Sequence, residues 1–259
     1  MRRRPVALAA AALFAAVALR AAEAPQPAYF VLHQEIVKPA NAQAYEQLTK
    51  EFISVVQQHR EASPAFNFTG FAGTESVYSY TTRIQDFATL DKIYAGFAAL
   101  SGAVGEAQWN DLMKRTSAPI EFIRESLLME DPALSYAPEQ PRLKPEDVRY
   151  FHFDLYFVQP GREAEADAVA RDIAALFRKK GVPDGYRVLK TLFGPDTPLL
   201  TVVIGARDPA DFAALDAAGR ELLGAEGKAL FARAFALTRR FEQHGAWLRA
   251  DLSLPPVGK

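Results

Sequence analysis

The sequence contains no cysteine among its 259 residues. This absence excludes disulfide bonds, a thiol nucleophile, thiolate metal sites and a lipid-modified cysteine. The fold must therefore be stabilised by its apolar core alone. Apolar residues make up 49% of the chain, which is enough to build one large domain or two small ones.

The motifs of several common enzyme classes are also absent. There is no glycine-rich phosphate loop, no G-x-S-x-G elbow, no H-E-x-x-H zinc motif and no dinucleotide fingerprint. Conventional hydrolase, kinase and dehydrogenase functions therefore lack support. Basic and aromatic residues do not gather in a patch, and the net charge is -1, so nucleic acid is not an expected partner.

The first 24 residues differ in composition from the rest. Arg2-Arg3-Arg4 precede a short apolar run, residues 6–19, which is followed by Ala22-Glu23-Ala24. This order is typical of a secretory signal peptide, and the run is shorter than the roughly 20 residues that span a bilayer. We expect residues 1–24 to be removed and the protein to be periplasmic or secreted in a bacterium, without stable membrane insertion. An uncleaved anchor is the alternative.

Two stretches alternate apolar and polar residues as strands do, Tyr29–Val37 (YFVLHQEIV) and Tyr150–Val158 (YFHFDLYFV). Proline follows each of them, at Pro39 and Pro160. The first is followed by a helical pattern over residues 41–59. Two short strands are then predicted near 66–72 and 76–83, a helix from 86, a helical piece around Trp109 and a strand near 120–129.

Residues 131–148 contain four prolines and few large apolar residues, which predicts a linker outside any core. After this segment the pattern repeats. The apolar stripe of the first helix matches a second stripe when 121 is added to each residue number. The matched stripes are Tyr45, Leu48, Phe52, Val55 and Val56, and Ala166, Val169, Ile173, Leu176 and Phe177. We therefore expect two halves, 25–130 and 149–254, a last strand near 246–252, and a tail at 255–259.

Each half has the element order β-α-β-β-α-β, which is the ferredoxin-like order of an α+β fold. Helices cover one face of such a sheet, and two units on one chain can cover each other's second face. We predict two tandem ferredoxin-like units packed sheet to sheet as a single-chain α+β barrel, a monomer with an internal pseudo-dimer.

This arrangement resembles the dimeric α+β barrel superfamily, which includes antibiotic-biosynthesis monooxygenases, NIPSNAP-like domains and haem-binding chlorite dismutases. The resemblance covers residues 28–254 and rests on element order and duplication, not on a catalytic motif. It implies a ligand site between the sheet and the helices or inside the barrel.

The candidate site residues lie on the two alternating strands. His33 and Glu35 share one strand face, and Tyr150, His152, Asp154 and Tyr156 share another, because side chains two apart on a strand point the same way. The opposite faces are more apolar and are predicted to lie under the helices. The polar faces would then point into the space between the sheets.

These residues permit several interpretations. A carboxylate beside an imidazole can make a general base. Two such pairs brought together can bind a divalent metal, and either histidine can be an axial haem ligand. Alternatively, each pair is a buried polar pair that satisfies its own hydrogen bonds. The repeat maps His33 onto Asp154, so the pairs are not equivalent, and no metal site is predicted.

Two functions of different class follow. The first is an exported, non-catalytic module that binds a small apolar or aromatic ligand. The alternative is a small-molecule oxidoreductase, either cofactor-free and monooxygenase-like or haem-dependent, that uses His33 or His152. The sequence alone leaves the cofactor and the ligand open.

Overall fold

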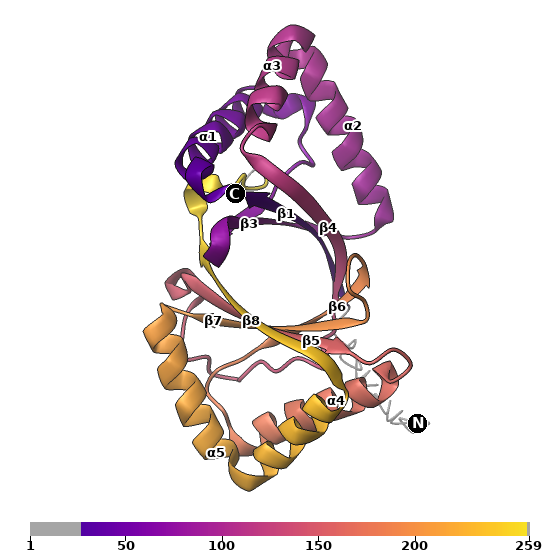
Figure 1. Cartoon of the computed structure of the whole chain (residues 1–259), viewed down its shortest axis with the longest axis vertical. Coiled ribbons are helices and arrows are strands. Elements are labelled where there is room, and N and C mark those ends of the chain that lie inside the picture. The colour runs from indigo at the N-terminus through magenta and orange to yellow at the C-terminus, as the bar shows by residue number, and fades with distance from the viewer. Residues whose placement is uncertain (1–26, 258–259) are drawn as a thin grey trace, which may run out of the picture.

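The computed structural model describes residues 27–257, so the predicted signal peptide lies outside the described residues. Eight antiparallel strands close a barrel in the order β1-β3-β2-β8-β5-β7-β6-β4, with helices packed outside it (Figure 1). The strands are β1 (Ala28–Val37), β2 (Thr69–Gly73), β3 (Val77–Ile84), β4 (Ile120–Glu130), β5 (Tyr150–Val158), β6 (Arg187–Phe193), β7 (Leu199–Ala206) and β8 (Thr238–Leu248). The predicted α+β barrel is confirmed.

The helices form two separate groups on opposite sides of the barrel (Figure 1). They are α1 (Ala42–Gln58), α2 (Phe87–Val104), α3 (Glu106–Ser117), α4 (Glu163–Lys180) and α5 (Pro209–Ala236). Within residues 27–257, none of the helices combines the length and apolarity that a bilayer crossing requires. The first group packs on the strands of the first half, and the second group on those of the second half.

The last strand begins earlier than the sequence predicts. β8 covers Thr238–Leu248, whereas the prediction placed a strand near residues 246–252. Its first residues, TRRFEQ, are mostly charged or polar, so they carry little apolar signal. Pairing with β5 along its whole length makes this segment a strand.

The two strand faces are reversed relative to the prediction. Phe30 and Leu32 of β1 pack with Phe151 and Phe153 of β5 in a cluster inside the barrel. The opposite face of β1 points to the helices, since Glu35 accepts a hydrogen bond from the Tyr45 hydroxyl of α1. Alternation in the sequence separates the two faces of a strand. It does not show which face points into the barrel and which contacts the helices, because both faces are covered here.

The strand pairing is similar in the two halves along β1 and β5. Helices α1 and α4 begin at residues 42 and 163. His33 pairs with Glu125 of β4, and its counterpart Asp154 pairs with Gln243 of β8. The register is irregular at the end of both β1 and β5. Positions 121 apart in the first elements of each half can therefore be compared directly.

The proline-rich segment 131–148 is not wholly outside a core, which corrects the prediction. Leu134 and Tyr136 are buried in the apolar cluster of the second half. Tyr136 also exchanges backbone hydrogen bonds with Tyr186. The prolines predicted an exposed linker, but Leu134 and Tyr136 attach this segment to the core of the second half.

The chain after β8 returns to the first half. Leu252 and Leu254 are fully buried in its core, and the backbone of Leu254 pairs with Phe68. Gly70 permits this approach, because a Cβ there would lie 2.3 Å from the Leu252 carbonyl oxygen. Residues 249–254 therefore tie the end of the second half to the first.

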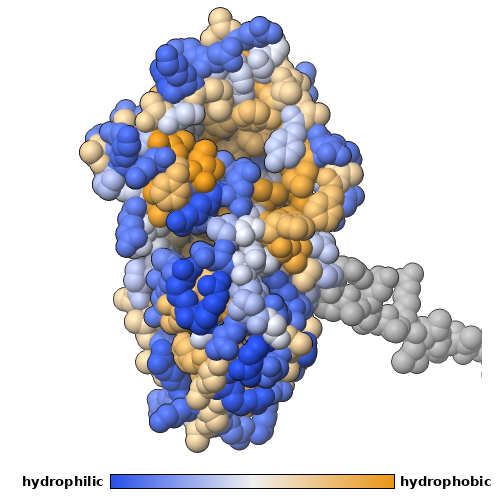
Figure 2. Space-filling model, turned by 45° about the vertical axis from the view of Figure 1, so that its right-hand side comes forward, coloured by the Kyte–Doolittle hydropathy of each residue, from blue (hydrophilic) through white to orange (hydrophobic). Residues whose placement is uncertain are grey.

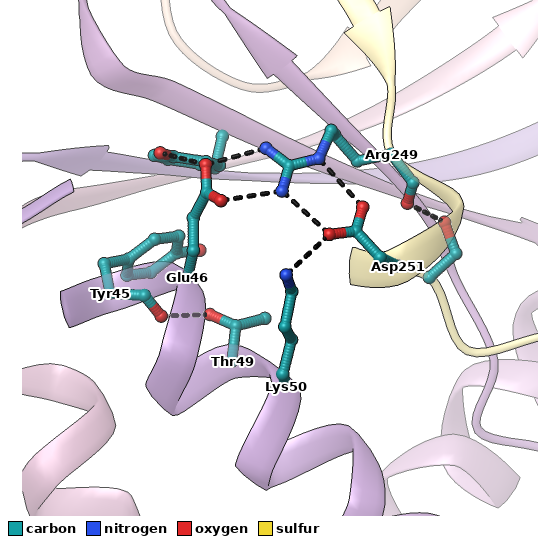
Figure 3. Close-up of polar contacts among 8 residues, drawn as sticks. Tyr45, Glu46, Thr49, Lys50, Arg249 and Asp251 are labelled. Carbon is teal, nitrogen blue, oxygen red and sulfur yellow. Dashed lines mark hydrogen bonds and ion pairs between the residues drawn. The ribbon is translucent and has the colours of Figure 1, made fainter. Parts of the chain in front are cut away.

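An ion-pair network anchors this returning segment to α1 (Figure 3). The Arg249 guanidinium donates two hydrogen bonds of 2.7 Å to the Glu46 carboxylate. It also donates to Asp251, which pairs with Lys50 at 2.8 Å. The hydrogen bonds from Arg249 hold the pKa of Glu46 below its usual value of 4.5.

We predict that Arg249→Met destabilises the protein by about 1–3 kcal/mol at pH 7, because Glu46 and Asp251 lose their shared cation. A lowered carboxyl pKa stabilises the fold above the unfolded-state value, and this contribution disappears as the pH falls through the folded-state value. Urea unfolding at pH 7 and pH 3 should therefore show a smaller difference at pH 3. Arg233→Met, which breaks an exposed pair with Asp172, is the control and should cost less than about 1 kcal/mol. Equal losses at both positions would contradict the role of the network.

Apolar side chains also gather on the surface of the first half. Figure 2 shows two such patches beside a hollow in the upper part of the molecule, whereas the lower part is mostly hydrophilic. Exposed large apolar residues of this half include Phe87, Tyr94, Phe122 and Ile123. These patches are distinct from the cavity of the second half described next.

Candidate functional site: a cavity in the second half

A cavity of ≈ 800 Å³ lies between the outer face of the second-half strands and helices α4 and α5. This volume is within the range of small-molecule sites. Its wall is mostly apolar and includes Ala166, Val169, Ile173, Leu200, Val202 and Phe231. The first half has a corresponding space between its strands and helices, but side chains fill it.

Four aromatic residues of the first half are replaced by smaller residues in the second. Strand pairing and the shift of 121 identify the replacements, since Glu35 pairs with Tyr78 as Tyr156 pairs with Leu200. The equivalent pairs are Tyr45 and Ala166, Phe52 and Ile173, Tyr78 and Leu200, and Tyr80 and Val202. All four of the smaller residues line the cavity. The cavity therefore arises from lost aromatic volume.

The first half shows how this space is filled. Tyr45 is only 2% exposed, and its ring lies 4.4 Å from that of Tyr78. Phe52 contacts Trp109 with ring centroids 6.0 Å apart, and Trp109 contacts Phe97 at 5.2 Å. Burial of aromatic rings makes a large contribution to stability. The first half is thus a filled core, in which Trp109 is buried.

A break in α5 shapes one side of the cavity. Gly224 interrupts the helix with φ 57° and ψ −144°, a conformation that favours glycine. Gly219, Gly224 and Gly227 all belong to the cavity wall. The corresponding break in the first half is Gly105, which separates α2 from α3. This break was not predicted, although three glycines within nine residues of a helix were a usable signal.

Polar groups occupy one part of the cavity wall. Asp154 and Tyr156 project from β5, Gln243 from β8 and Arg220 from α5. The Asp154 Oδ1 atom accepts a hydrogen bond from Gln243 Nε2 at 2.7 Å and lies 3.0 Å from His152 Nε2. Burial raises the pKa of Tyr156, and the charge of Asp154 raises it further. Tyr156 is therefore a neutral phenol beside a carboxylate in an apolar cavity.

Two of the other predicted residues lie next to the cavity. The His152 ring stacks on Phe212 of α5, with centroids 3.9 Å apart, and Phe212 belongs to the cavity wall. The Tyr150 ring lies 6.5 Å from that of Phe212 and packs edge-on against Trp247 at 5.5 Å. The structure thus brings Tyr150, His152, Asp154 and Tyr156 together on one face. Gln243 and Arg220 were missed, because neither belongs to a recognisable motif.

His33 and Glu35 lie apart from this cavity, on the first half. His33 is 3.1 Å from both the Glu35 and the Glu125 carboxylates. Burial lowers the pKa of His33, but the hydrogen bonds and charges of Glu35 and Glu125 outweigh it and raise the pKa above 6.5. Glu35 also accepts a hydrogen bond from the hydroxyl of the buried Tyr45. This cluster is a satisfied polar network at the partly exposed edge of the filled core.

The raised pKa of His33 predicts a pH-dependent contribution to stability. Protonated His33 favours the fold below its unfolded-state pKa of 6.5, and this contribution is lost as the pH rises through the folded-state value. Glu125→Gln should lower stability at pH 6 by less than about 1 kcal/mol, since Glu125 is largely exposed. It should have no effect at pH 9. Chemical denaturation at the two pH values measures this difference, and equal losses would exclude the ion pair as its cause.

The histidines do not fit the haem or metal sites considered from the sequence. Both ring nitrogens of His33 face carboxylates. The Nε2 atom of His152 faces Asp154, and Phe212 covers the ring. Neither arrangement leaves an imidazole aimed at a space that could hold a haem. In residues 27–257, no three His, Asp or Glu side chains are grouped to hold a metal ion.

Comparison with known proteins gives similarity of fold but not of sequence. No known protein family matches the sequence, and no curated protein matches it. An anthrone oxidase-like protein has a TM-score of 0.55 and 17% identity over 90% of this chain and 94% of its own. A monooxygenase-like protein from Lactobacillus acidophilus has a TM-score of 0.50 and 6% identity over 88% and 95%.

A chlorite dismutase from Candidatus Nitrospira defluvii is more distant, with a TM-score of 0.48 and 10% identity over 86% of this chain and 92% of its own. At these identities the neighbours inform on fold alone. This chain has the closed eight-stranded architecture of the dimeric α+β barrel proteins.

Proposed function

We propose that the protein binds a small, largely apolar molecule in the cavity of its second half. The observation that carries this proposal is the replacement of four aromatic residues by smaller ones around a space that the first half fills. An empty space of this size in a core would destabilise the fold. Binding a ligand offsets that cost, and Asp154, Tyr156, Gln243 and Arg220 would orient the ligand.

Export and gene duplication are part of the same proposal. The basic and apolar N-terminal residues support removal of residues 1–24 and a periplasmic or secreted location. The repeated element order and the equivalent strand registers support two tandem ferredoxin-like units. In this proposal the duplicated halves diverged, so that one became a filled core and the other a binding site.

The experiment is a titration of the mature protein with N-phenyl-1-naphthylamine, an apolar dye that becomes fluorescent when shielded from water. We expect saturable binding of one dye molecule. Native mass spectrometry of protein purified from an exporting host should also show a retained organic molecule. Absence of both saturable dye binding and a retained molecule would contradict a binding role.

A second candidate function is cofactor-free oxidation by dioxygen. The specific observation is Asp154, a carboxylate held by Gln243 and His152 at the wall of an apolar cavity. A carboxylate in this position can act as a general base toward an acidic C–H group. The overall reaction would be R2CH2 + O2 → R2C=O + H2O, in which the deprotonated substrate reduces dioxygen. The anthrone oxidase-like neighbour shares the fold at 17% identity.

Oxygen consumption with anthrone as the substrate tests this second candidate. Asp154→Asn should lower the turnover number by about 100-fold or more if Asp154 is the base. Retained dye binding in this variant would show that the cavity is intact. No oxygen consumption by the unmodified protein would leave the binding role as the function of the cavity.

A further inference from the structure

The two halves place different groups at one equivalent position. In the first half the Tyr45 ring fills it, and its hydroxyl donates to Glu35 and lies 2.5 Å from the Tyr80 hydroxyl. In the second half Ala166 stands at this position on α4, and the volume of the missing phenol belongs to the cavity. The first half therefore has a tyrosine ring where the second half has cavity volume.

Two hydrogen-bonding groups of β5 belong to the wall of the same cavity as Ala166. Tyr156 is equivalent to Glu35, and Asp154 is equivalent to His33. Both contacts of Asp154 use its Oδ1 atom. Among the described residues, none of the hydrogen bonds engages Oδ2. A carboxylate oxygen at the wall of an apolar cavity requires a donor, because leaving it unpaired is costly when water is displaced.

Tyr156 does not itself fill the open position. Its ring packs against Phe241 at 4.8 Å and against Phe235 at 5.7 Å. It therefore leans toward β8 and α5, away from Leu200 and Val202 on the other side of β5. Leu200 and Val202 stand where the first half has Tyr78 and Tyr80. Their aliphatic side chains can pack against an aromatic ring of the ligand.

We propose that the cavity ligand carries a phenol ring that takes the place of the missing tyrosine. The ring would lie against Ala166, Leu200 and Val202, and its hydroxyl would donate to Asp154 Oδ2 beside Tyr156. This inference rests on the proposed binding function and narrows it to phenol-bearing molecules. The remainder of the ≈ 800 Å³ would hold the rest of the ligand.

Three small probes test this assignment by displacing N-phenyl-1-naphthylamine from the mature protein. They are p-cresol, which is the side chain of tyrosine, toluene, which lacks the hydroxyl, and 4-methylanisole, which cannot donate. We expect p-cresol to bind about 3- to 10-fold more tightly than either of the others, which is the effect of one hydrogen bond. Hydrophobicity alone would favour toluene, so the expected order cannot arise from simple partitioning.

Asp154→Leu keeps the branched shape of the side chain and removes both acceptor oxygens. In this variant p-cresol should lose its advantage while the dye still binds. Glu242→Leu also replaces a carboxylate by an aliphatic side chain, but on the opposite face of neighbouring β8. It is the control and should retain the preference. If toluene binds as tightly as p-cresol to the unmodified protein, or if neither displaces the dye, the phenol assignment is wrong while the apolar site stands. If the dye itself does not bind, the proposed function fails as well.

Discussion

Phe52→Ala should lower the free energy of unfolding by about 3–5 kcal/mol, as expected for removal of a packed aromatic ring. Phe52 packs with Phe66, Phe97 and Trp109 in the filled half. Removing its ring leaves a void that these rings cannot close by small shifts. Denaturant unfolding of the mature protein, followed by circular dichroism, measures the loss.

Ile173→Ala is the matched control, because Ile173 occupies the equivalent position on α4 beside an existing cavity. Its truncation removes apolar contact but creates little new void, so the loss should be about 1–2 kcal/mol. A loss at Ile173 equal to that at Phe52 would mean that both halves are equally packed. That result would contradict the origin of the cavity.

Ala166→Phe should abolish binding of the apolar dye. Ala166 occupies the position where the first half holds Tyr45, so an aromatic ring fits there without rearrangement and fills the space. We expect affinity to fall by about 100-fold or more, since the ligand and the new ring cannot share one volume. Stability should stay the same or rise, because cavity filling commonly adds about 0.5–2 kcal/mol.

Ala175→Phe is the control for this substitution. Ala175 lies on the same helix but is exposed and outside the cavity wall. Dye affinity should therefore be unchanged in this variant. Equal weakening by both substitutions would indicate a general effect on α4 and not occupation of the cavity.

The architecture was predictable because it depends on periodicity. Alternation identified β1 and β5, and the stripes of α1 and α4 matched at a fixed shift. In the structure β1 and β5 pair with their neighbours in a similar way. The direction of the strand faces was not predictable. Phe30 and Phe151 are as apolar as residues under a helix, and only the closed barrel decides that they point inward.

Part of the cavity could have been predicted by aligning the two halves of the sequence. Aligning Tyr45 with Ala166 and Phe52 with Ile173 already shows a loss of volume at matched positions. These matches were interpreted only as evidence of duplication. Alignment could not predict that the cavity wall also includes Gln243, Arg220 and Gly224. Their place depends on how β8 and the broken helix α5 approach β5.

The most direct test of a ligand site in the second half is methyl NMR of the mature protein during titration with N-phenyl-1-naphthylamine. We predict chemical-shift changes at Ile173, Leu200 and Val202, which line the cavity. The methyl groups of Ile53, Val56 and Leu112, buried in the core of the first half, should not change. Changes confined to the first half, or no changes at saturating dye, would contradict a ligand site in the second half.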